Sequence, residues 1–378
     1  MLNKLKKSEI EIIKVLRDNP LISRADLSRI SGFSKPVVSY AVTDLINIGA
    51  IEEVKTGESS RKGGKKPILI SFVPDFRYIV GVDVGGNKII SILSDLDGHV
   101  INKKKHISKG INKEKELHSI IKESINSVIN VSPDKILGIG LGVPGTTDVK
   151  KGIIHQLPAF ELNNIPLKTM LEDDFNIPVI VSNDVTLNAY GEIWKGAAKD
   201  KENVFLIAIG TGTGSGLVLN GNLYPGANNL SGEIGYMITD WSAEKNKSIK
   251  SFGNLESWFS GNGFETRVKE ELGIELTSIE FFDLIPKDKR IRDIFYEGCN
   301  HFCLAVSNIL TLLDPGLIVI TGGIGFNRYN EIMKVISPIL NKIVPPEILE
   351  KTEFRKGKLG ELGVALGATK LVHDTFFV

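Results

Sequence analysis

Two segments of the chain, about 120 residues apart, share one pattern. Residues 78–98 read YIVGVDVGGNKIISILSDLDG, and residues 203–221 read NVFLIAIGTGTGSGLVLNG. In each segment a run of valine and isoleucine is followed by a glycine-rich turn and a second apolar run, which predicts a buried β-hairpin. Helical stretches separate the other apolar runs of the body, so the pattern predicts an α/β fold made of two related lobes.

The two glycine turns are candidate phosphate sites. Backbone amides of a glycine-rich turn can approach an anion closely without help from a basic side chain. A single turn of this kind more often marks a tight hairpin, whereas a pair at matching positions of two lobes favours a binding function. The candidate residues are Asp83, Gly85, Gly86, Gly212, Thr213 and Gly214.

Charge separates the N-terminal segment from the body. The whole chain has 46 basic and 45 acidic side chains, but residues 1–66 hold 13 basic and 8 acidic ones, a net charge of +5. The remaining residues carry a net charge of −4. The basic segment suggests a polyanionic partner without establishing one, because an exposed helical domain can be basic by chance.

The composition favours a soluble cytoplasmic protein of two or three domains. Hydrophobic residues make up 42% of the chain and charged residues 24%. Two cysteines, Cys299 and Cys303, cannot form a disulfide framework, which indicates a reducing compartment. The N-terminal residues lack the apolar core of a signal peptide, and no apolar run approaches the ~18 residues of a membrane span.

The spacing of residues 8–47 is typical of a helix-turn-helix. Residues 8–19 carry an apolar stripe, and a second helix begins with the capping box SRAD at Ser23, with Leu27 and Ile30 facing inward. Gly32 lies in a three-residue turn, after which Ser34 is expected to cap a third helix.

The third helix has two distinct faces. Its buried face is expected to consist of Val38, Val42, Leu45 and Ile46. Its outer face carries the candidate base and phosphate contacts Lys35, Ser39, Tyr40 and Thr43.

Two short strands, at 51–54 and 68–72, flank the loop TGESSRKGGKKP. This arrangement resembles the winged helix-turn-helix of bacterial repressors, in which cations of the wing follow phosphates or enter a narrow minor groove. A basic linker and a protein-docking helical domain are the alternatives, but helix spacing and wing together favour DNA binding. The candidate wing residues are Arg61, Lys62, Lys65 and Lys66.

Five motifs of the body resemble the ROK family of repressors and sugar kinases. In chain order they are GVPG at 142–145, VSNDVTLNAYGEIWKGAA at 181–198, GTGTGSGLVLNGNLYPGANNLSGEIGY at 210–236, VITGGIG at 319–325 and GELGVALGAT at 360–369. The resemblance implies the two-lobed, ribonuclease H-like fold of sugar kinases and actin-like ATPases behind the winged helix-turn-helix. The expected domains are residues 1–72 for DNA binding, 77–187 plus 360–378 for the first lobe, and 188–359 for the second.

The resemblance also implies site residues. Asp184 holds the position of the general base that, in ROK kinases, takes the proton of the attacking sugar hydroxyl. Asn183 and Glu233 match residues that hydrogen-bond sugar hydroxyls, and Glu256 matches a further sugar-contacting glutamate. The structural alternative for Asp184 is a helix cap, because it follows an apolar strand and begins a helix.

Departures from the family pattern argue against a kinase. Tyr236 replaces a histidine, Asn87 replaces the usual threonine of the first turn, and Ala159 stands near where a sugar-contacting asparagine is usual. The family's zinc-binding cysteines should fall between residues 247 and 256, where this chain has none, so no metal and no cofactor is expected. Cys299 and Cys303, even with His301 between them, are expected to be buried structural residues.

These features predict a DNA-binding regulator, a repressor of carbohydrate-utilisation genes, that binds a sugar between its lobes. Its expected partners are operator DNA and a second copy of the chain, in a homodimer or homotetramer, with the segment 72–76 transmitting motion of the lobes. One alternative is an ATP-dependent hexose or amino-sugar kinase with Asp184 as base, which would require ATP and Mg²⁺. Another is a DNA-binding protein whose sugar site is inactive. The identity of the sugar, and whether it releases or promotes DNA binding, stay open.

Overall fold

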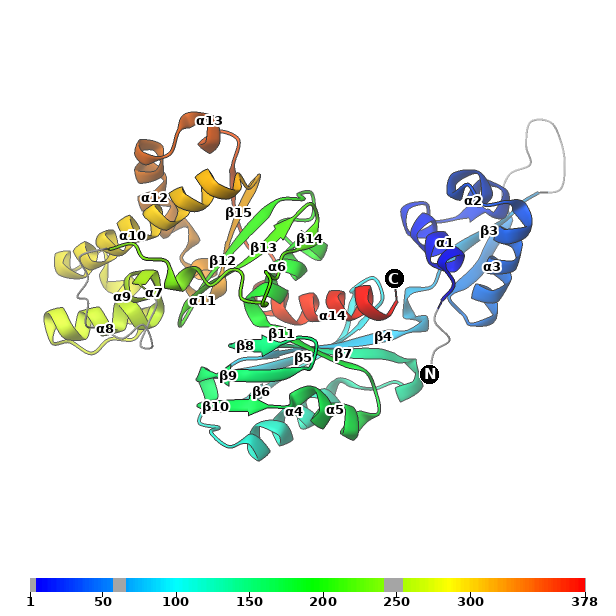
Figure 1. The fold of residues 1–378 in the computed structure, drawn as a ribbon, viewed down its shortest axis with the longest axis horizontal. Helices are drawn as coiled ribbons and strands as arrows, with labels where there is room; N and C mark the ends of the chain where they lie inside the picture. Colours follow the sequence, from blue (N-terminus) through cyan, green and yellow to red (C-terminus); the bar gives the residue numbers. More distant parts are fainter. Residues whose placement is uncertain (1–4, 57–65, 241–253, 378) are drawn as a thin grey trace.

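The computed structural model describes residues 5–56, 66–240 and 254–377. Figure 1 shows a small N-terminal module beside a larger body of two lobes. The module packs three helices on a small antiparallel sheet in the order β1-β3-β2. Its elements are α1 (Lys7–Asp18), β1 (Ile22–Ser23), α2 (Arg24–Ser31), α3 (Lys35–Asn47), β2 (Ile51–Thr56) and β3 (Ile68–Phe72).

The helix-turn-helix prediction is confirmed, with corrections in its detail. Gly32 ends α2 at φ +73°, a left-handed conformation that glycine adopts without strain. Ser23 caps α2, because its hydroxyl accepts a hydrogen bond from the amide of Asp26 at 3.1 Å. The carboxylate of Asp26, however, accepts from that hydroxyl at 2.7 Å and not from the helix amides. Ser34 holds the cap position of α3, but its side chain makes no capping bond.

The core of the module also differs from the prediction at two residues. Val38, Val42 and Leu45 are completely buried, as expected, whereas Ile46 is half-buried. Ile30 is 49% exposed, although it was expected to face inward. The two-turn helix α2 buries only the narrow stripe around Leu27 against the other two helices, and Ile30 lies outside it.

The first lobe is built on a five-stranded sheet in the order β11-β7-β4-β5-β6. Its central hairpin, β4 with β5, is antiparallel, while β4, β7 and β11 run parallel. The elements are η1 (Pro74–Phe76), β4 (Tyr78–Val84), β5 (Lys88–Asp95), β6 (Val100–Ile107), α4 (Glu114–Val128), η2 (Pro133–Lys135), β7 (Ile136–Val143), β8 (Thr146–Asp148), β9 (Ile153–Leu157), η3 (Pro158–Phe160), β10 (Leu162–Ile165), α5 (Leu167–Phe175) and β11 (Val179–Asn183).

The second lobe repeats this topology. Its sheet has the order β14-β13-β12-β15-β16, with β12 and β13 antiparallel and β12, β15 and β16 parallel. The predicted duplication is therefore confirmed. The elements are β12 (Val204–Ile209), β13 (Thr213–Leu219), β14 (Asn222–Leu223), η4 (Ile234–Tyr236), α7 (Asn254–Trp258), α8 (Gly261–Leu272), α9 (Ser278–Leu284), α10 (Lys289–Leu313), β15 (Leu317–Thr321), α11 (Gly322–Asn327), α12 (Tyr329–Ile343), α13 (Pro346–Leu349) and β16 (Glu353–Lys356).

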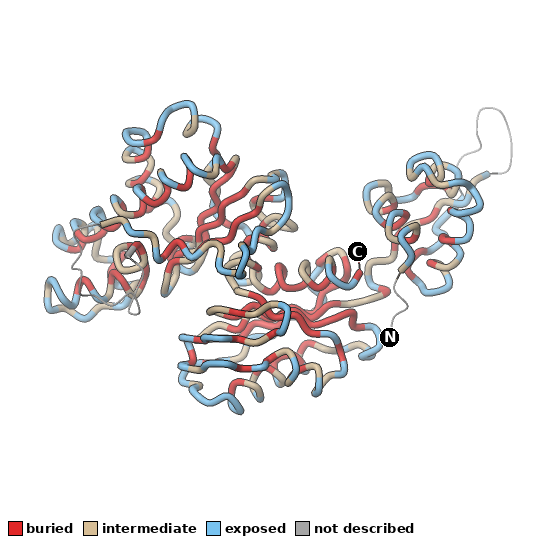
Figure 2. The backbone as a smooth tube through the Cα atoms, viewed as in Figure 1, coloured by how far each residue is buried: buried red, intermediate tan, exposed pale blue. Residues whose placement is uncertain are grey.

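Two helices pack together where the lobes meet: α6 (Asp184–Lys195) and, after η5 (Gly360–Leu362), the C-terminal α14 (Gly363–Phe376). Glycines allow their backbones to approach closely. A Cβ at Gly367 would collide with the carbonyl oxygen of Leu187, and a Cβ at Gly191 would collide with that of Gly363. Figure 2 shows buried backbone along both central sheets, so this helix pair lies between two packed cores.

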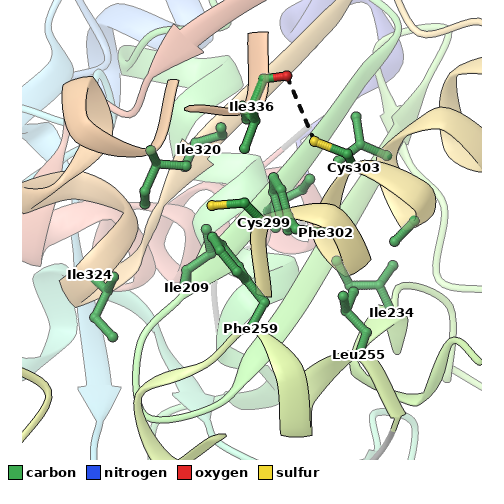
Figure 3. Close-up of a cluster of buried hydrophobic side chains, with 14 of the residues drawn as sticks. Ile209, Ile234, Leu255, Phe259, Cys299, Phe302, Cys303, Ile320, Ile324 and Ile336 are labelled. Carbon is green, nitrogen blue, oxygen red and sulfur yellow. Dashed lines mark hydrogen bonds between the residues drawn. The ribbon is translucent and has the colours of Figure 1, made fainter. Parts of the chain in front are cut away.

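Cys299 and Cys303 lie in the apolar core of the second lobe, where both thiols are free and fully buried (Figure 3). Burial raises the pKa of Cys303 to about 12 and also raises the pKa of Cys299. His301 does not join them, because its ring stacks on Trp258 at 3.9 Å and its Nδ1 lies 3.0 Å from the hydroxyl of Thr239. The expected structural role of the two cysteines is confirmed. Among the described residues, no helix combines the length and apolarity needed to cross a bilayer.

Candidate functional site

Asn183 and Asp184 stand at the junction of β11 and α6. The cap of α6 is Asn183, whose Oδ1 accepts a hydrogen bond from the amide of Thr186 at 3.0 Å. The Asn183 amide group donates to the carbonyl of Gly145 at 3.3 Å, which ties α6 to the loop after β7. Asp184 is the first helical residue, so the capping role considered for it belongs to Asn183. Its carboxylate accepts from the next amide, that of Val185, at 2.8 Å.

Four carboxylates, which we call the carboxylate cluster, are linked pairwise by their charges: Asp184 acts on Asp83 and on Glu233, and Glu256 acts on Glu233. Burial, followed by the charge of Asp184, raises the pKa of Asp83 to about 7. Burial raises the pKa of Asp184 as well. Glu233 lies at the solvent-exposed edge of the cluster. Its carboxyl is still partly surrounded by protein, and this partial burial, followed by the charges of Asp184 and Glu256, raises its pKa. The cluster consists of Asp83, Asp184, Glu233 and Glu256.

Lys88, the cation whose charge acts on Asp83, is already paired. Lys88 lowers the pKa of Asp83, yet its ammonium lies 3.1 Å from the carboxylate of Glu361. Lys103 and Lys105 lie 3.7 Å from the same carboxylate. Acidic side chains at this site suit a neutral ligand with hydroxyl donors better than a polyphosphate.

The first glycine turn is closed by its own hydrogen bonds. The amide of Gly85 donates to the carbonyl of Lys88 at 2.9 Å, and Ser108 donates to the carbonyl of Gly85 at 2.5 Å. Ala159 lies beside this turn, because a Cβ at Gly86 would be 2.9 Å from that of Ala159. The structure thus places Ala159 next to the first glycine turn, a neighbourhood that the sequence did not predict.

The second glycine turn already binds a carboxylate of the protein itself, that of Glu256. The amide of Thr213 donates to the carboxylate of Glu256 at 2.8 Å, and its hydroxyl donates to the carbonyl of Phe259. A Cβ at Gly212 would lie 2.5 Å from that carboxylate. Gly214 packs against Val185 of α6. A phosphate that uses the amide of Thr213 would have to displace Glu256, a contact that no sequence signal could have revealed.

Two cavities lie in the second lobe. One, of about 490 Å³, is bounded by Gly210 and Thr211 of the second turn and by Gly323 at the start of α11. Its other lining residues, which sequence reasoning missed, are Ser278, Ile279, Phe282, Ile324, Asn327 and Arg328. The other, of about 910 Å³, lies between α9, α10 and α12, and none of its lining residues is a predicted site residue. Tyr236 is 58% exposed at the end of η4.

The predicted DNA-contacting residues of α3 share one exposed face. Tyr40 is 74% exposed, while the hydroxyl of Thr43 donates back to the carbonyl of Ser39 at 2.8 Å. Lys35 and Lys66 are exposed. The other predicted wing residues, Arg61, Lys62 and Lys65, lie outside the described residues. The same is true of most of the segment 247–256, where the zinc-binding cysteines of the family were expected. Within the described parts of the chain, no cluster of three or more His, Cys, Asp or Glu could hold a metal ion.

The family is decided by comparison with protein-family models. Residues 79–375 match the model of the ROK family. The chain belongs to the ROK family. Residues 5–52 match a model of winged helix-turn-helix DNA-binding domains, so this ROK protein combines the family body with a DNA-binding module.

Named relatives and solved structures include regulators and kinases of the ROK family. The xylose repressor of Bacillus spizizenii is 30% identical over 97% of this chain and 94% of its own length. The glucokinase of Halalkalibacterium halodurans is 29% identical over 79% of this chain and 96% of its own. The crystal structure of a ROK transcriptional regulator, a homologue of the Escherichia coli Mlc protein, superposes with a TM-score of 0.81 at 20% identity, covering 97% of this chain and 95% of its own.

The raised pKa of Asp83 predicts a pH-dependent stability. A carboxyl whose pKa is about 7 in the folded state, against 3.8 ordinarily, stabilises the fold below pH 4 and loses that contribution as pH rises toward 7. Asp83→Asn should therefore raise the free energy of unfolding at pH 8 by on the order of 2–4 kcal/mol relative to its effect at pH 4.5. Urea unfolding at both pH values measures this difference. The exposed Asp293→Asn is the control, and equal effects of Asp83→Asn at both pH values would contradict the prediction.

Proposed function

We propose that this ROK protein is a transcriptional repressor that binds operator DNA through its winged helix-turn-helix and binds a sugar effector at the carboxylate cluster. The observation that carries the proposal is the coexistence of two features in one chain. One is an exposed recognition helix, α3, with Tyr40 directed to solvent. The other is the meeting of acidic side chains from both lobes around Asp184.

The chemistry of the cluster supports a sugar as the ligand. Sugar hydroxyls donate hydrogen bonds, and carboxylates such as Asp184 and Glu233 are strong acceptors with several lone pairs each. A ligand that lacks the hydroxyl that donates to Asp184 would leave this partly buried acceptor unpaired, which gives the site its selectivity. Asn183 and Glu256 are further proposed contacts, although each already makes a hydrogen bond within the protein.

We take D-xylose as the effector because xylose repressors match this chain over nearly its full length. The genes under control would then encode proteins of carbohydrate use. A homodimer or homotetramer would present two copies of α3 to half-sites one helical turn apart, or a multiple of it. A palindromic operator near the protein's own gene is the expected target.

The proposal is tested by measuring the affinity of the protein for its own promoter region with and without sugars. We expect D-xylose to change the affinity by about tenfold or more, a coupling of ~1.4 kcal/mol or above. D-Glucose and N-acetyl-D-glucosamine serve as comparison sugars. Absence of binding to this DNA, or an affinity that no sugar alters, would refute the proposal.

A kinase is the second candidate, because Asp184 and both glycine turns are present and glucokinases are among the relatives. The contact between Glu256 and Thr213 opposes it, since the protein's own carboxylate holds an amide that a phosphate would need. Sugar-dependent release of ADP from ATP, abolished by Asp184→Asn, would favour the kinase. We expect no such turnover.

The exposed tyrosine of α3 predicts a mutation that affects DNA binding alone. Tyr40→Ala should weaken operator binding by about tenfold or more, because one base-edge contact contributes ~1–3 kcal/mol, and it should leave the melting temperature unchanged. Fluorescence anisotropy with labelled operator measures the loss. The control is Tyr296→Ala, which removes another exposed tyrosine from α10, far from α3 in the fold. Wild-type affinity in Tyr40→Ala would exclude Tyr40 from the interface.

A further inference from the structure

We propose that Arg17 of the DNA-binding module is the positioning residue through which the sugar site controls DNA binding. Its guanidinium contacts the end of α14, and movement of α14 would change the position of the module relative to the body. The inference rests on the proposed function and adds the route by which the sugar acts. Figure 1 shows the C-terminal end of α14 directed at the module, next to α1.

Arg17 lies in α1 but its guanidinium contacts the body. Its Nη1 is 2.9 Å from Nε2 of His373, its Nη2 donates to the carbonyl of Leu96 at 3.0 Å, and its Nε is 3.1 Å from the carboxylate of Asp97. The side chain is largely buried, which lowers its pKa. We call these four residues, Arg17, Leu96, Asp97 and His373, the Arg17 anchor.

Aromatic rings complete the contact between module and body. The guanidinium carbon of Arg17 lies 4.8 Å from the ring centre of Phe72 and 5.6 Å from that of Phe377. Phe72 ends the module's sheet, Phe76 lies in the linker and Phe377 follows α14, and the three ring centres are 5.9–6.2 Å apart. The cores of module and body are therefore continuous, so the module is not a freely tethered domain.

Hydrogen bonds continue from the anchor to α6. A guanidinium only donates, so Nε2 of His373 must accept and Nδ1 must carry the proton. That proton is donated to the carboxylate of Asp374 at 2.9 Å. Asp374 also accepts from the hydroxyl of Tyr190, a residue of α6, and from Lys370 at 2.5 Å. Burial lowers the pKa of His373, which favours the neutral ring that this arrangement requires.

The helix α6 starts at the proposed sugar site, since Asp184 is its first residue and Tyr190 follows within two turns. At Gly191 and Gly367 its backbone packs directly on that of α14, so movement of one helix is passed to the other. A sugar that hydrogen-bonds to Asp184 therefore pulls on α6 and, through it, on α14. The C-terminal end of α14 contacts Arg17.

Glu192 places this helix pair at the pivot of the lobes. Its buried carboxylate accepts from the amide of Ala197, at 2.6 Å, where the chain enters the second lobe. It also accepts from the amides of Lys358 and Leu359, both at 2.9 Å, where the chain returns. Closure of the lobes around a ligand would turn about these crossings and carry α6 and α14 with it. The helix pair would then have one arrangement with the lobes open and another with the lobes closed. Sugar and operator would each favour one of these two arrangements.

The test compares Arg17→Ala with Lys14→Ala, which removes an equal charge from the exposed side of α1. For each variant, D-xylose affinity is measured by calorimetry and operator affinity is measured with and without D-xylose. We expect Arg17→Ala to bind D-xylose within about twofold of the wild type, while the effect of D-xylose on operator affinity falls from about tenfold to less than about twofold. Lys14→Ala should keep the wild-type ratio. An unchanged ratio in Arg17→Ala overturns the proposal, because a merely structural role would not alter the ratio.

A second variant and a second measurement keep the inference independent of folding and of the proposed function. Tyr190→Phe removes the hydroxyl that donates to Asp374 but keeps the aromatic ring. It should lower the ratio of operator affinities measured with and without D-xylose. If no sugar affects operator binding by the wild type, the proposed function is refuted. The Arg17 anchor is then tested by the distance measurement alone.

Spin labels at Asn47→Cys and Lys115→Cys report the distribution of distances between module and body. Arg17→Ala should broaden this distribution. An unaltered distance distribution overturns the anchor itself.

Discussion

Asp184→Asn is expected to weaken the response of operator binding to sugar strongly while leaving operator binding itself intact. The substitution keeps the shape of the side chain but replaces a charged acceptor by a neutral amide. A hydrogen bond to a charged group contributes ~1.5–3 kcal/mol, so the concentration of D-xylose needed for half of the effect should rise about 10- to 150-fold. Titration of the operator complex with D-xylose measures this shift.

The same substitution should not destabilise the protein without ligand. Burial raises the pKa of Asp184, which means that the ionised carboxylate is less favourable in the folded chain than in the unfolded chain. An amide at this position removes that unfavourable charge, so the melting temperature should stay the same or rise. A roughly 10- to 150-fold weaker response to D-xylose together with a melting temperature that does not fall separates a binding role from a structural one.

The matched control for Asp184→Asn is Asp314→Asn. Asp314 is exposed after α10 and adopts a left-handed conformation with φ +44°, which asparagine tolerates. It should respond to D-xylose like the wild type. If Asp184→Asn retains the full response, Asp184 does not contact the effector and the site must be sought elsewhere, for example in the cavity next to Gly210.

Gly367→Ala is expected to have the largest effect on stability of any single methyl group added to the helix pair. The new Cβ would collide with the backbone carbonyl of Leu187, which is part of α6 and cannot rotate away as a side chain can. Separating two packed helices costs about 3 kcal/mol or more, at the upper end of overpacking effects. Thermal and urea unfolding of the variant measure the loss.

Gly323→Ala provides the comparison for this prediction. Gly323 is also a helical glycine, in α11, but a Cβ there would meet nothing within 4 Å. Its replacement should be neutral or stabilise the protein by up to ~1 kcal/mol, because alanine is the better helix former. Equal effects at the two positions would show that α6 and α14 are not tightly packed, and would also remove the rigid link on which the role of Arg17 depends.

Local sequence determined the elements of this protein. The spacing from Ser23 to Phe72 specified the helix-turn-helix and the two strands β2 and β3 that follow it, and the paired glycine turns specified two lobes of one topology. These features are readable because capping, turn and periodicity signals act over a few residues. The same holds for the outer face of α3, since a helical period assigns Tyr40 and Val38 to opposite faces without knowledge of the rest of the chain.

Tertiary structure decided the contacts between segments that are far apart in the chain. Arg17 and His373 are 356 residues apart, and the sequence offers no reason to pair them. Glu256 could be read as a ligand contact, but its position on the amide of Thr213 follows from the packing of α7 on the second turn. Ile30 is apolar yet exposed, because burial depends on which stripe of a short helix its neighbours cover. Helical periods and turn residues are local properties of the chain, whereas burial, charge pairing and the pKa of Asp83 are set by neighbours that only folding brings together.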